Sequence, residues 1–102
     1  MALDINLNLN AENSELTVLL AGRLDTLTSP ELDEKLTENI PGIKNLIFDM
    51  TELKYISSSG LRVLLKYQAE MKKTGGMKIK NVRKEVMAVL EITGFTKFLN
   101  IE

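Results

Sequence analysis

The sequence predicts a single α/β domain, residues 1–102, in which helices pack on a mixed sheet of four to five strands. Two apolar segments separated by a short polar turn open the chain. Further apolar strand segments then alternate with helical repeats, as expected when helices cover a sheet. No linker, low-complexity tract or internal repeat interrupts this order. With 44% apolar residues, the chain is long enough to bury one core.

The chain opens with a predicted β-hairpin. Apolar and polar residues alternate from Leu3 to Asn10, which is the period-two pattern of a strand with one solvated face. Residues 11–14 supply a polar turn, and residues 16–21 form a more continuously apolar segment. We therefore expect two paired strands joined by this turn.

A helix is expected after the second strand. Thr28 or Ser29 can cap it, because Thr28 and Glu31 fit a capping box and Pro30 suits a first turn. Pro41-Gly42 ends it. The side that packs on the sheet is marked by apolar residues at four-residue spacing, namely Leu32, Leu36 and Ile40.

A central strand and a second helix are predicted for the middle of the chain. Residues 46–48 form an unbroken apolar run, typical of a strand covered on both faces. A short loop ending in three serines then leads into a helix from about residue 60 to residue 73. The later elements are a glycine stop at residues 75–76, a strand over 77–82, a helix over 86–93 ending at Gly94, and a short strand or helix over 95–101.

Composition excludes several kinds of active site. The chain has no cysteine, which excludes thiolate nucleophiles and zinc–thiolate sites, and no histidine, which excludes histidine-dependent triads. Thirteen basic and fourteen acidic residues give a net charge of −1, so no basic excess indicates nucleic acid. No segment resembles a signal peptide or membrane span. We expect a soluble cytoplasmic protein that is not an enzyme and needs no metal or cofactor.

Three consecutive serines precede the second helix. Exposed amides and the helix dipole favour negative charge at a helix N-terminus, so a phosphate on one of these serines would be stabilised. Helical phase turns Ser57 and Ser58 toward the buried stripe that contains Leu61. The same phase places Ser59 on the outer face, three residues before Arg62, which can neutralise part of a phosphate. The alternative is that Ser57 or Ser58 only caps the helix.

The segment Gly22-Arg23-Leu24-Asp25 is a second candidate loop between a strand and a helix. Loops at the carboxyl ends of neighbouring parallel strands share one edge of an open sheet, where partners and ligands bind. This predicts that Asp25 lies near Ser59. The alternative is an ordinary turn, in which glycine gives backbone freedom and aspartate bonds locally. Asp49 is likewise expected to bond loop amides rather than to act as an acid or base.

A hydrolase with a serine nucleophile is a further alternative. Because the chain has no histidine, its base would be Lys54 or Lys66. Either lysine would need burial and a strongly lowered pKa.

Together these motifs resemble those of STAS domains, specifically the stand-alone bacterial anti-sigma factor antagonists. The resemblance covers nearly the whole chain, and its strongest parts are Gly22-Arg23-Leu24-Asp25, Asp49-Met50-Thr51 and Ser58-Ser59-Gly60-Leu61. In that family the serine immediately before the glycine is phosphorylated by the partner, an anti-sigma factor with serine kinase activity. The resemblance assigns this role to Ser59. It also implies that the unphosphorylated form binds the anti-sigma factor and frees the sigma factor, and that a serine phosphatase resets the protein.

One position departs from the family pattern. Many members have an aspartate where this chain has Ser57, which leaves Ser58 and Ser57 as alternative phosphorylation sites. The alternative function is a soluble STAS scaffold, or a subunit of a signalling or transporter complex, that binds without a phosphoswitch. The predicted partner-binding residues are Gly22, Arg23, Asp25, Ser57, Ser58, Ser59, Gly60 and Arg62.

Overall fold

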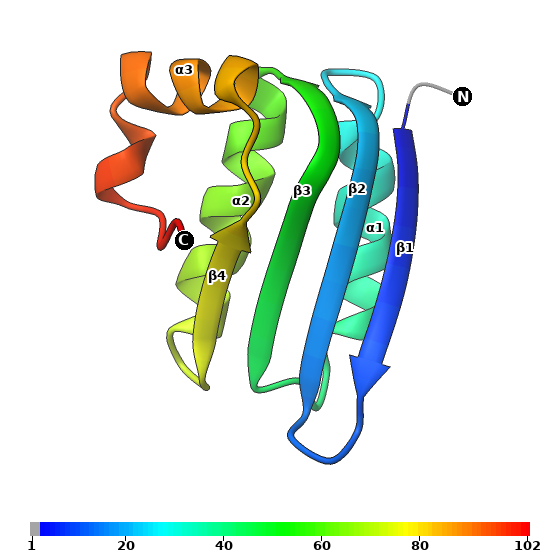
Figure 1. Ribbon diagram of the computed structural model, residues 1–102. Coiled ribbons are helices and arrows are strands. Elements are labelled where there is room, and N and C mark those ends of the chain that lie inside the picture. The colour runs from blue at the N-terminus through cyan, green and yellow to red at the C-terminus, as the bar shows by residue number, and fades with distance from the viewer. Residues whose placement is uncertain (1–2) are drawn as a thin grey trace.

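A four-stranded mixed sheet carries its two longest helices on one face (Figure 1). This arrangement is seen in a computed structural model that describes residues 3–102. β1 is antiparallel to β2, whereas β2, β3 and β4 run parallel, which confirms the predicted hairpin and mixed sheet. The strands, in spatial as well as chain order, are β1 (Leu3–Asn10), β2 (Glu15–Leu24), β3 (Asn45–Ile56) and β4 (Gly76–Lys80).

The helices follow the predicted order. α1 and α2 cover one face of the sheet, α3 lies at the end toward which β3 and β4 run, and the C-terminus returns beside β4 (Figure 1). Residues 95–101, expected as a strand or a helix, form the short helix η1 and a single parallel bridge between Ile101 and Ile79. The helices are α1 (Ser29–Asn39), α2 (Ser58–Met71), α3 (Lys84–Ile92) and the 3-10 helix η1 (Phe95–Lys97).

Two expected loops are in fact strand. Residues 22–24 continue β2, and residues 51–56 continue β3 almost to the serines. The pairing of β2 with β3 shifts register twice, between Leu19 and Ala21 and between Gly22 and Arg23. Such bulges break the two-residue alternation by which a strand is recognised in a sequence. Gly22 has φ +106°, a backbone conformation that favours glycine.

The prediction that residues 46–48 are covered on both faces is wrong. Leu46 and Phe48 are fully buried under the helices, but Ile47 between them is only half-buried. Its neighbours across the sheet are Thr17 and Lys78, so the second face of the sheet is open and mostly polar. The core therefore forms one layer between sheet and helices, and includes Val18, Leu20, Leu32, Leu36, Phe48, Leu61 and Leu64.

None of the helices within residues 3–102 is long and apolar enough to cross a membrane.

Candidate functional site

The loop after β2 and the start of α2 lie side by side. The Ser57 amide donates to the Leu24 carbonyl (2.9 Å), which joins the ends of β3 and β2. Two residues further along each segment, the hydroxyl oxygens of Thr26 and Ser59 are 3.4 Å apart. The predicted meeting of the two loops at one edge of the sheet is therefore confirmed.

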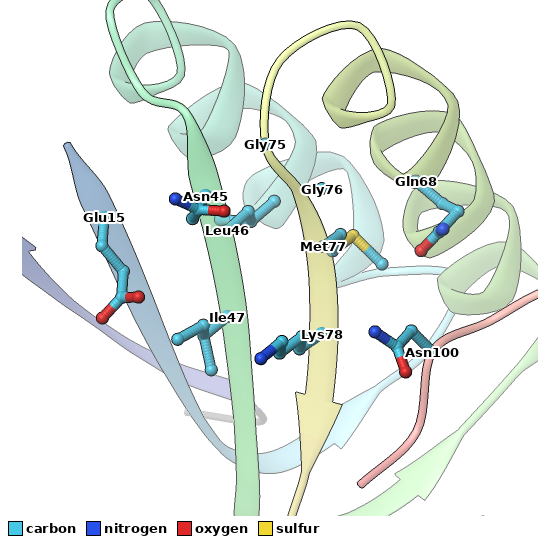
Figure 2. Close-up of a pocket in the computed structure, with 10 residues that line it drawn as sticks. All are labelled: Glu15, Asn45, Leu46, Ile47, Gln68, Gly75, Gly76, Met77, Lys78 and Asn100. Atoms are coloured by element: carbon cyan, nitrogen blue, oxygen red, sulfur yellow. The ribbon is translucent and has the colours of Figure 1, made fainter. Parts of the chain in front are cut away.

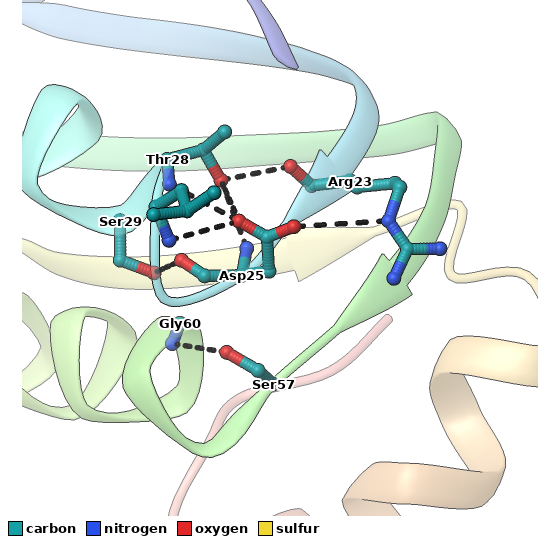
Figure 3. Close-up of polar contacts among 7 residues, drawn as sticks. Arg23, Asp25, Thr28, Ser29, Ser57 and Gly60 are labelled. Atoms are coloured by element: carbon teal, nitrogen blue, oxygen red, sulfur yellow. Dashed lines mark hydrogen bonds and ion pairs between the residues drawn. The ribbon is translucent and has the colours of Figure 1, made fainter. Parts of the chain in front are cut away.

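Ser57 is the N-cap of α2. Its backbone is extended (φ −102°, ψ 175°), and its Oγ accepts a hydrogen bond from the Gly60 amide at 3.4 Å (Figure 3). Its carbonyl accepts from the Leu61 amide at 3.0 Å. This geometry is that of a serine satisfying a free amide in the first helical turn. The alternative that a serine caps this helix is thus confirmed for Ser57.

Ser58 and Ser59 do not lie as helical phase predicted. Ser58 is exposed rather than turned toward the core, and Ser59 is half-buried rather than fully outward. α2 begins only at Ser58, so the phase counted back from Leu61 does not extend to Ser57. The second reason is tertiary, because the loop carrying Thr26 lies beside Ser59.

Gly60 brings the first turn of α2 against the ends of β2 and β3. A Cβ placed on Gly60 would lie 2.7 Å from Leu24 Cγ and 2.9 Å from Ile56 Cγ1, and both of these side chains are fully buried. Real Cβ atoms do not approach other atoms this closely. The absence of a side chain at Gly60 therefore sets how close Ser59 lies to the loop.

Asp25 stabilises its own turn instead of facing the serines. Its Oδ1 accepts from the Leu27 amide (3.0 Å) and the Thr28 amide (3.1 Å), and the Thr28 hydroxyl lies 3.2 Å away (Figure 3). Desolvation raises the pKa of Asp25, but these hydrogen bonds, with Arg23 nearby, outweigh it and hold that pKa below its ordinary value. The local hydrogen bonding expected of Asp25 in the turn interpretation is confirmed, although residues 22–24 before it are strand.

The capping box predicted for α1 is absent. Thr28 occupies the N-cap position, but its side chain makes no cap bond to the helix. Its hydroxyl instead accepts from the Asp25 amide (2.8 Å) and donates to the Arg23 carbonyl (2.9 Å). Pro30 lies in the first turn, as predicted.

Arg23 is held on its own side of the turn. Its Nε lies 3.7 Å from Asp25 Oδ2, and its guanidinium stacks 4.1 Å from the centroid of the Tyr55 ring. The Arg23 side chain is more than half exposed, so the ion pair contributes little to stability.

A shallow groove of about 280 Å³ runs beside Ser59, between α1 and α2. Sequence reasoning missed Thr26 and Asp33, which reach this groove from the loop and from α1. No local pattern marks these two residues, because only the packing of α1 against α2 brings them to Ser59. Arg62, predicted to lie near Ser59, does line the groove, together with Thr26, Ser29, Pro30, Asp33, Ser59 and Val63.

Asp33 links α1 to α2 at the far side of the groove. Its Oδ1 accepts from Lys66 Nζ (2.8 Å) and from the Tyr67 hydroxyl (2.5 Å). The hydrogen bonds from Lys66 and Tyr67 lower the pKa of Asp33, and the bond to Asp33 raises the pKa of Lys66. A general base would need the opposite shift, and Lys54, the other candidate base, is exposed on β3. The geometry therefore does not support the hydrolase alternative.

Asp49 also has a local role. Its Oδ1 accepts from the Thr51 hydroxyl (2.6 Å), the Thr51 amide (3.1 Å) and Asn81 Nδ2 (3.2 Å). The hydrogen bond from the Thr51 hydroxyl is the main cause that lowers the pKa of Asp49. The expectation that this carboxylate bonds nearby polar groups is confirmed, although Asp49 lies within β3 rather than at its end.

A second depression lies at the opposite end of the sheet, around the turn between α2 and β4 (Figure 2). Residues 72–75 form this turn and β4 begins at Gly76, so the chain turns at the predicted glycines but the helix already ends at Met71. The Gly75 amide donates to the Lys44 carbonyl at 2.6 Å, and Gly76 has φ +111°. These contacts are structural. The lining residues are Glu15, Asn45, Leu46, Ile47, Gln68, Gly75, Gly76, Met77, Lys78 and Asn100.

Known proteins share this fold and part of this sequence. The anti-sigma-B factor antagonist of Bacillus subtilis (strain 168) is 27% identical over 97% of this chain and 92% of its own length. An anti-sigma factor antagonist from Mycobacterium paratuberculosis has a similar structure, with a TM-score of 0.85, 17% identity, and coverage of 97% of this chain and 84% of its own.

A third relative, the anti-sigma factor antagonist SpoIIAA, has been solved in two forms. Its unphosphorylated form gives a TM-score of 0.81 with 19% identity, over 97% of this chain and 88% of that chain. Its phosphorylated form, from Bacillus, gives a TM-score of 0.73 with 18% identity, over 97% of this chain and 91% of that chain. These structural likenesses show the fold alone. The sequence profile of the STAS domain matches residues 6–102, and this chain therefore belongs to the STAS domain family.

Proposed function

We propose that this chain is an anti-sigma factor antagonist controlled by phosphorylation of Ser59. In the unphosphorylated state it binds an anti-sigma factor that has serine kinase activity, and the sigma factor is released. Phosphorylation of Ser59 ends this binding, and a serine phosphatase restores it. The chain acts as a binding protein and performs no catalysis itself. The proposal is supported by STAS membership and by the function named for the Bacillus subtilis relative.

The position of Ser59 is the observation that carries the proposal. Ser59 is the second residue of α2, where backbone amides lack helical acceptors and the dipole favours an anion. Its hydroxyl has only a long contact with Thr26 (3.4 Å), whereas the Ser57 hydroxyl serves as the helix cap. Ser58 is more exposed than Ser59 and is the alternative acceptor.

A phosphate on Ser59 would change the charge of the whole groove. It adds about −1.5 to −2 charges at neutral pH, beside the carboxylate of Asp33 and the guanidinium of Arg62. Against an acidic group or a bound nucleotide of the partner at ~8 Å and an effective dielectric of ~20, repulsion costs about 4 kcal/mol before screening. This corresponds to roughly a thousandfold loss of affinity. Pairing with Arg62 within the chain reduces that loss.

Phosphorylation is tested by incubating the protein with native cell extract and ATP, followed by mass spectrometry. Trypsin cuts after Lys54 and Arg62, so a single peptide, residues 55–62, contains all three serines. We expect one phosphate on this peptide, located on Ser59 by fragmentation, and none after Ser59→Ala. Ser14→Ala, in the distant hairpin turn, is the matched control and should leave phosphorylation unchanged. A phosphate retained by Ser59→Ala would move the site to Ser58 or Ser57.

Binding is tested with the purified anti-sigma factor of the same cells. Ser59→Ala should bind as the wild type does, and Ser59→Asp should bind about thirtyfold more weakly, since one charge gives about half of the repulsion of a phosphate. Thr96→Asp adds the same charge at an exposed position in η1 and should bind normally. Equal affinities of Ser59→Ala and Ser59→Asp would indicate a constitutive scaffold instead of a switch.

A further inference from the structure

The two edge strands of the sheet, β4 and β1, differ in whether their outer side is covered. The chain's own C-terminus covers the β4 edge, where the Ile79 amide donates to the Asn100 carbonyl (2.9 Å) and the Glu102 amide donates to the Ile79 carbonyl (2.8 Å). An ion pair between Lys78 Nζ and Glu102 Oε2 (3.2 Å) adds to this cover. Within residues 3–102, no strand pairs with the outer side of β1 (Figure 1). The outward backbone groups of β1 are therefore available to another strand.

β1 lacks the features that usually protect an edge strand from pairing. Natural edge strands are often short, contain lysine or proline, or carry a bulge. β1 is eight residues long, has neither lysine nor proline, and pairs with β2 in one continuous register. Asp4 is its only charged residue.

The apolar side chains of β1 are incompletely covered. They lie on the helix side of the sheet, because Ile5, Leu7 and Leu9 pair with the buried core residues Leu20, Val18 and Leu16, and Leu3 continues the same alternation. Leu3 is buried, Ile5 and Leu7 are half-buried, and Leu9 is 60% exposed. Another strand beside β1 would remove part of this apolar surface from water.

We propose that β1 pairs antiparallel with β1 of a second copy of this chain, which joins the two sheets across a twofold axis. The β1 sequence is complementary to itself in the register centred on Asn6. In that register Ile5 faces Leu7 of the second copy, and Leu3 faces Leu9, all on the helix side. On the open face Asp4 meets Asn8, so no like charges are opposed. The same patch is used by both copies, as a closed dimer requires.

The paired segment is short, and α1 opposes the association. One strand pair buries less surface than a permanent dimer needs, so the dimer is in equilibrium with the monomer. The twofold axis also places both copies of α1 on the same face of the joined sheet. Added salt should therefore favour the dimer, because it screens the repulsion between the mainly acidic α1 helices of the two copies. The charged residues of α1 are Glu31, Asp33, Glu34, Lys35 and Glu38.

Sedimentation equilibrium tests this association on the full chain, between about 10 µM and about 1 mM. The mass of the wild type should rise from 11.4 kDa toward twice that value. Asn6→Lys places two lysines opposite each other on the twofold axis and should remain monomeric throughout. The matched control makes the same change at an exposed position of the hairpin turn, Asn13→Lys, and should associate as the wild type does. Circular dichroism verifies that each variant is folded.

Disulfide trapping tests the register, because the natural chain has no cysteine. Asn6→Cys would face its own copy, at the Cβ separation of ~4.5–5.5 Å found for opposed strand residues, and should form a covalent dimer on mild oxidation. Asn8→Cys faces Asp4 instead and should cross-link at least tenfold less. A mass of 11.4 kDa at every concentration would overturn the proposal. So would unchanged association of Asn6→Lys, or equal cross-linking of the two cysteine variants.

Discussion

The two ends of α2 both meet the sheet at a glycine, but the neighbours of those glycines differ. At the N-terminal end, a Cβ on Gly60 would approach side-chain atoms of Leu24 and Ile56, at 2.7 and 2.9 Å. Beyond the C-terminal end, a Cβ on Gly75 would lie 2.5 Å from the Lys44 carbonyl oxygen, which is backbone. Side chains can shift by small amounts, whereas a hydrogen-bonded backbone cannot. A Cβ on Gly75 would thus meet backbone as well as the Asn45 side chain (Oδ1, 2.5 Å), which leaves the turn after α2 less room to adjust.

The hydroxyl groups at the two ends also differ. Ser58 and Ser59 stand where free amides and the helix dipole favour an anion. At the other end, the Thr74 hydroxyl donates to the Lys44 or Met71 carbonyl, and the helix dipole disfavours an anion there. The two ends of one helix therefore differ chemically, because the N-terminal end favours an anion and the C-terminal end is held by hydrogen bonds to backbone carbonyls.

The largest expected effect comes from Gly75→Ala. The new Cβ displaces the Lys44 carbonyl and weakens its hydrogen bond to residue 75, so the free energy of unfolding should fall by about 3 kcal/mol. Urea denaturation measures this change. Gly94→Ala is the comparison, because Gly94 has open space around it, so alanine there meets only the strain of a positive φ (+77°) and should cost only about 1 kcal/mol. Equal losses would show that the contact with Lys44 does not matter.

Gly60→Ala should cost less stability but disturb the candidate site more. Overpacking against Leu24 and Ile56 is partly offset by the better helix propensity of alanine, so unfolding free energy should fall by about 1 kcal/mol. The first turn must move away from the sheet, and Ser59 moves with it. We expect phosphorylation of Ser59 in native extract to slow roughly tenfold. An unchanged phosphorylation rate together with lower stability would show that Gly60 does not position Ser59.

The smallest effect is expected from Asp33→Asn in α1, whose side chain bonds Lys66 and Tyr67 midway along α2. At neutral pH the loss of the charged bonds to Lys66 and Tyr67 should lower unfolding free energy by about 0.5 kcal/mol, since Asp33 and Lys66 are partly exposed. The folded-state pKa of Asp33 is lowered, so its contribution is complete above the unfolded pKa of about 3.9 and disappears as pH falls through the folded value. Urea denaturation at several pH values should therefore show wild type and variant converging only in acid. A difference that persists in strong acid would rule out the carboxylate charge as the cause.

Much of the fold could be predicted from local sequence. The alternation in residues 3–10, Pro30, and the spacing of Leu32 and Leu36 each reflect one element with one buried side. The order of these elements also predicted that the loops near Asp25 and Ser59 share one edge of the sheet. Parallel strands force this arrangement whatever the details of packing.

Other features could not be read from the sequence because they depend on contacts between distant segments. The bulges that extend β2 depend on its pairing with β3, and the whole of α1 separates these two strands in the sequence. Likewise, Ile47 was predicted to be covered but lies on the open face of the sheet. A short apolar run does not reveal whether helices pack on one face of a sheet or on both.

The sequence by itself determined a mixed sheet with three serines at the start of a helix, since hydrophobic period and capping residues act locally. Only the tertiary structure decided what each hydroxyl faces. Ser57 bonds to its own helix, Ser58 to no residue within 3–102, and Ser59 lies against Thr26, thirty-three residues earlier. Exposure of a side chain depends on what packs beside it, and for Ser59 that neighbour comes from the loop after β2.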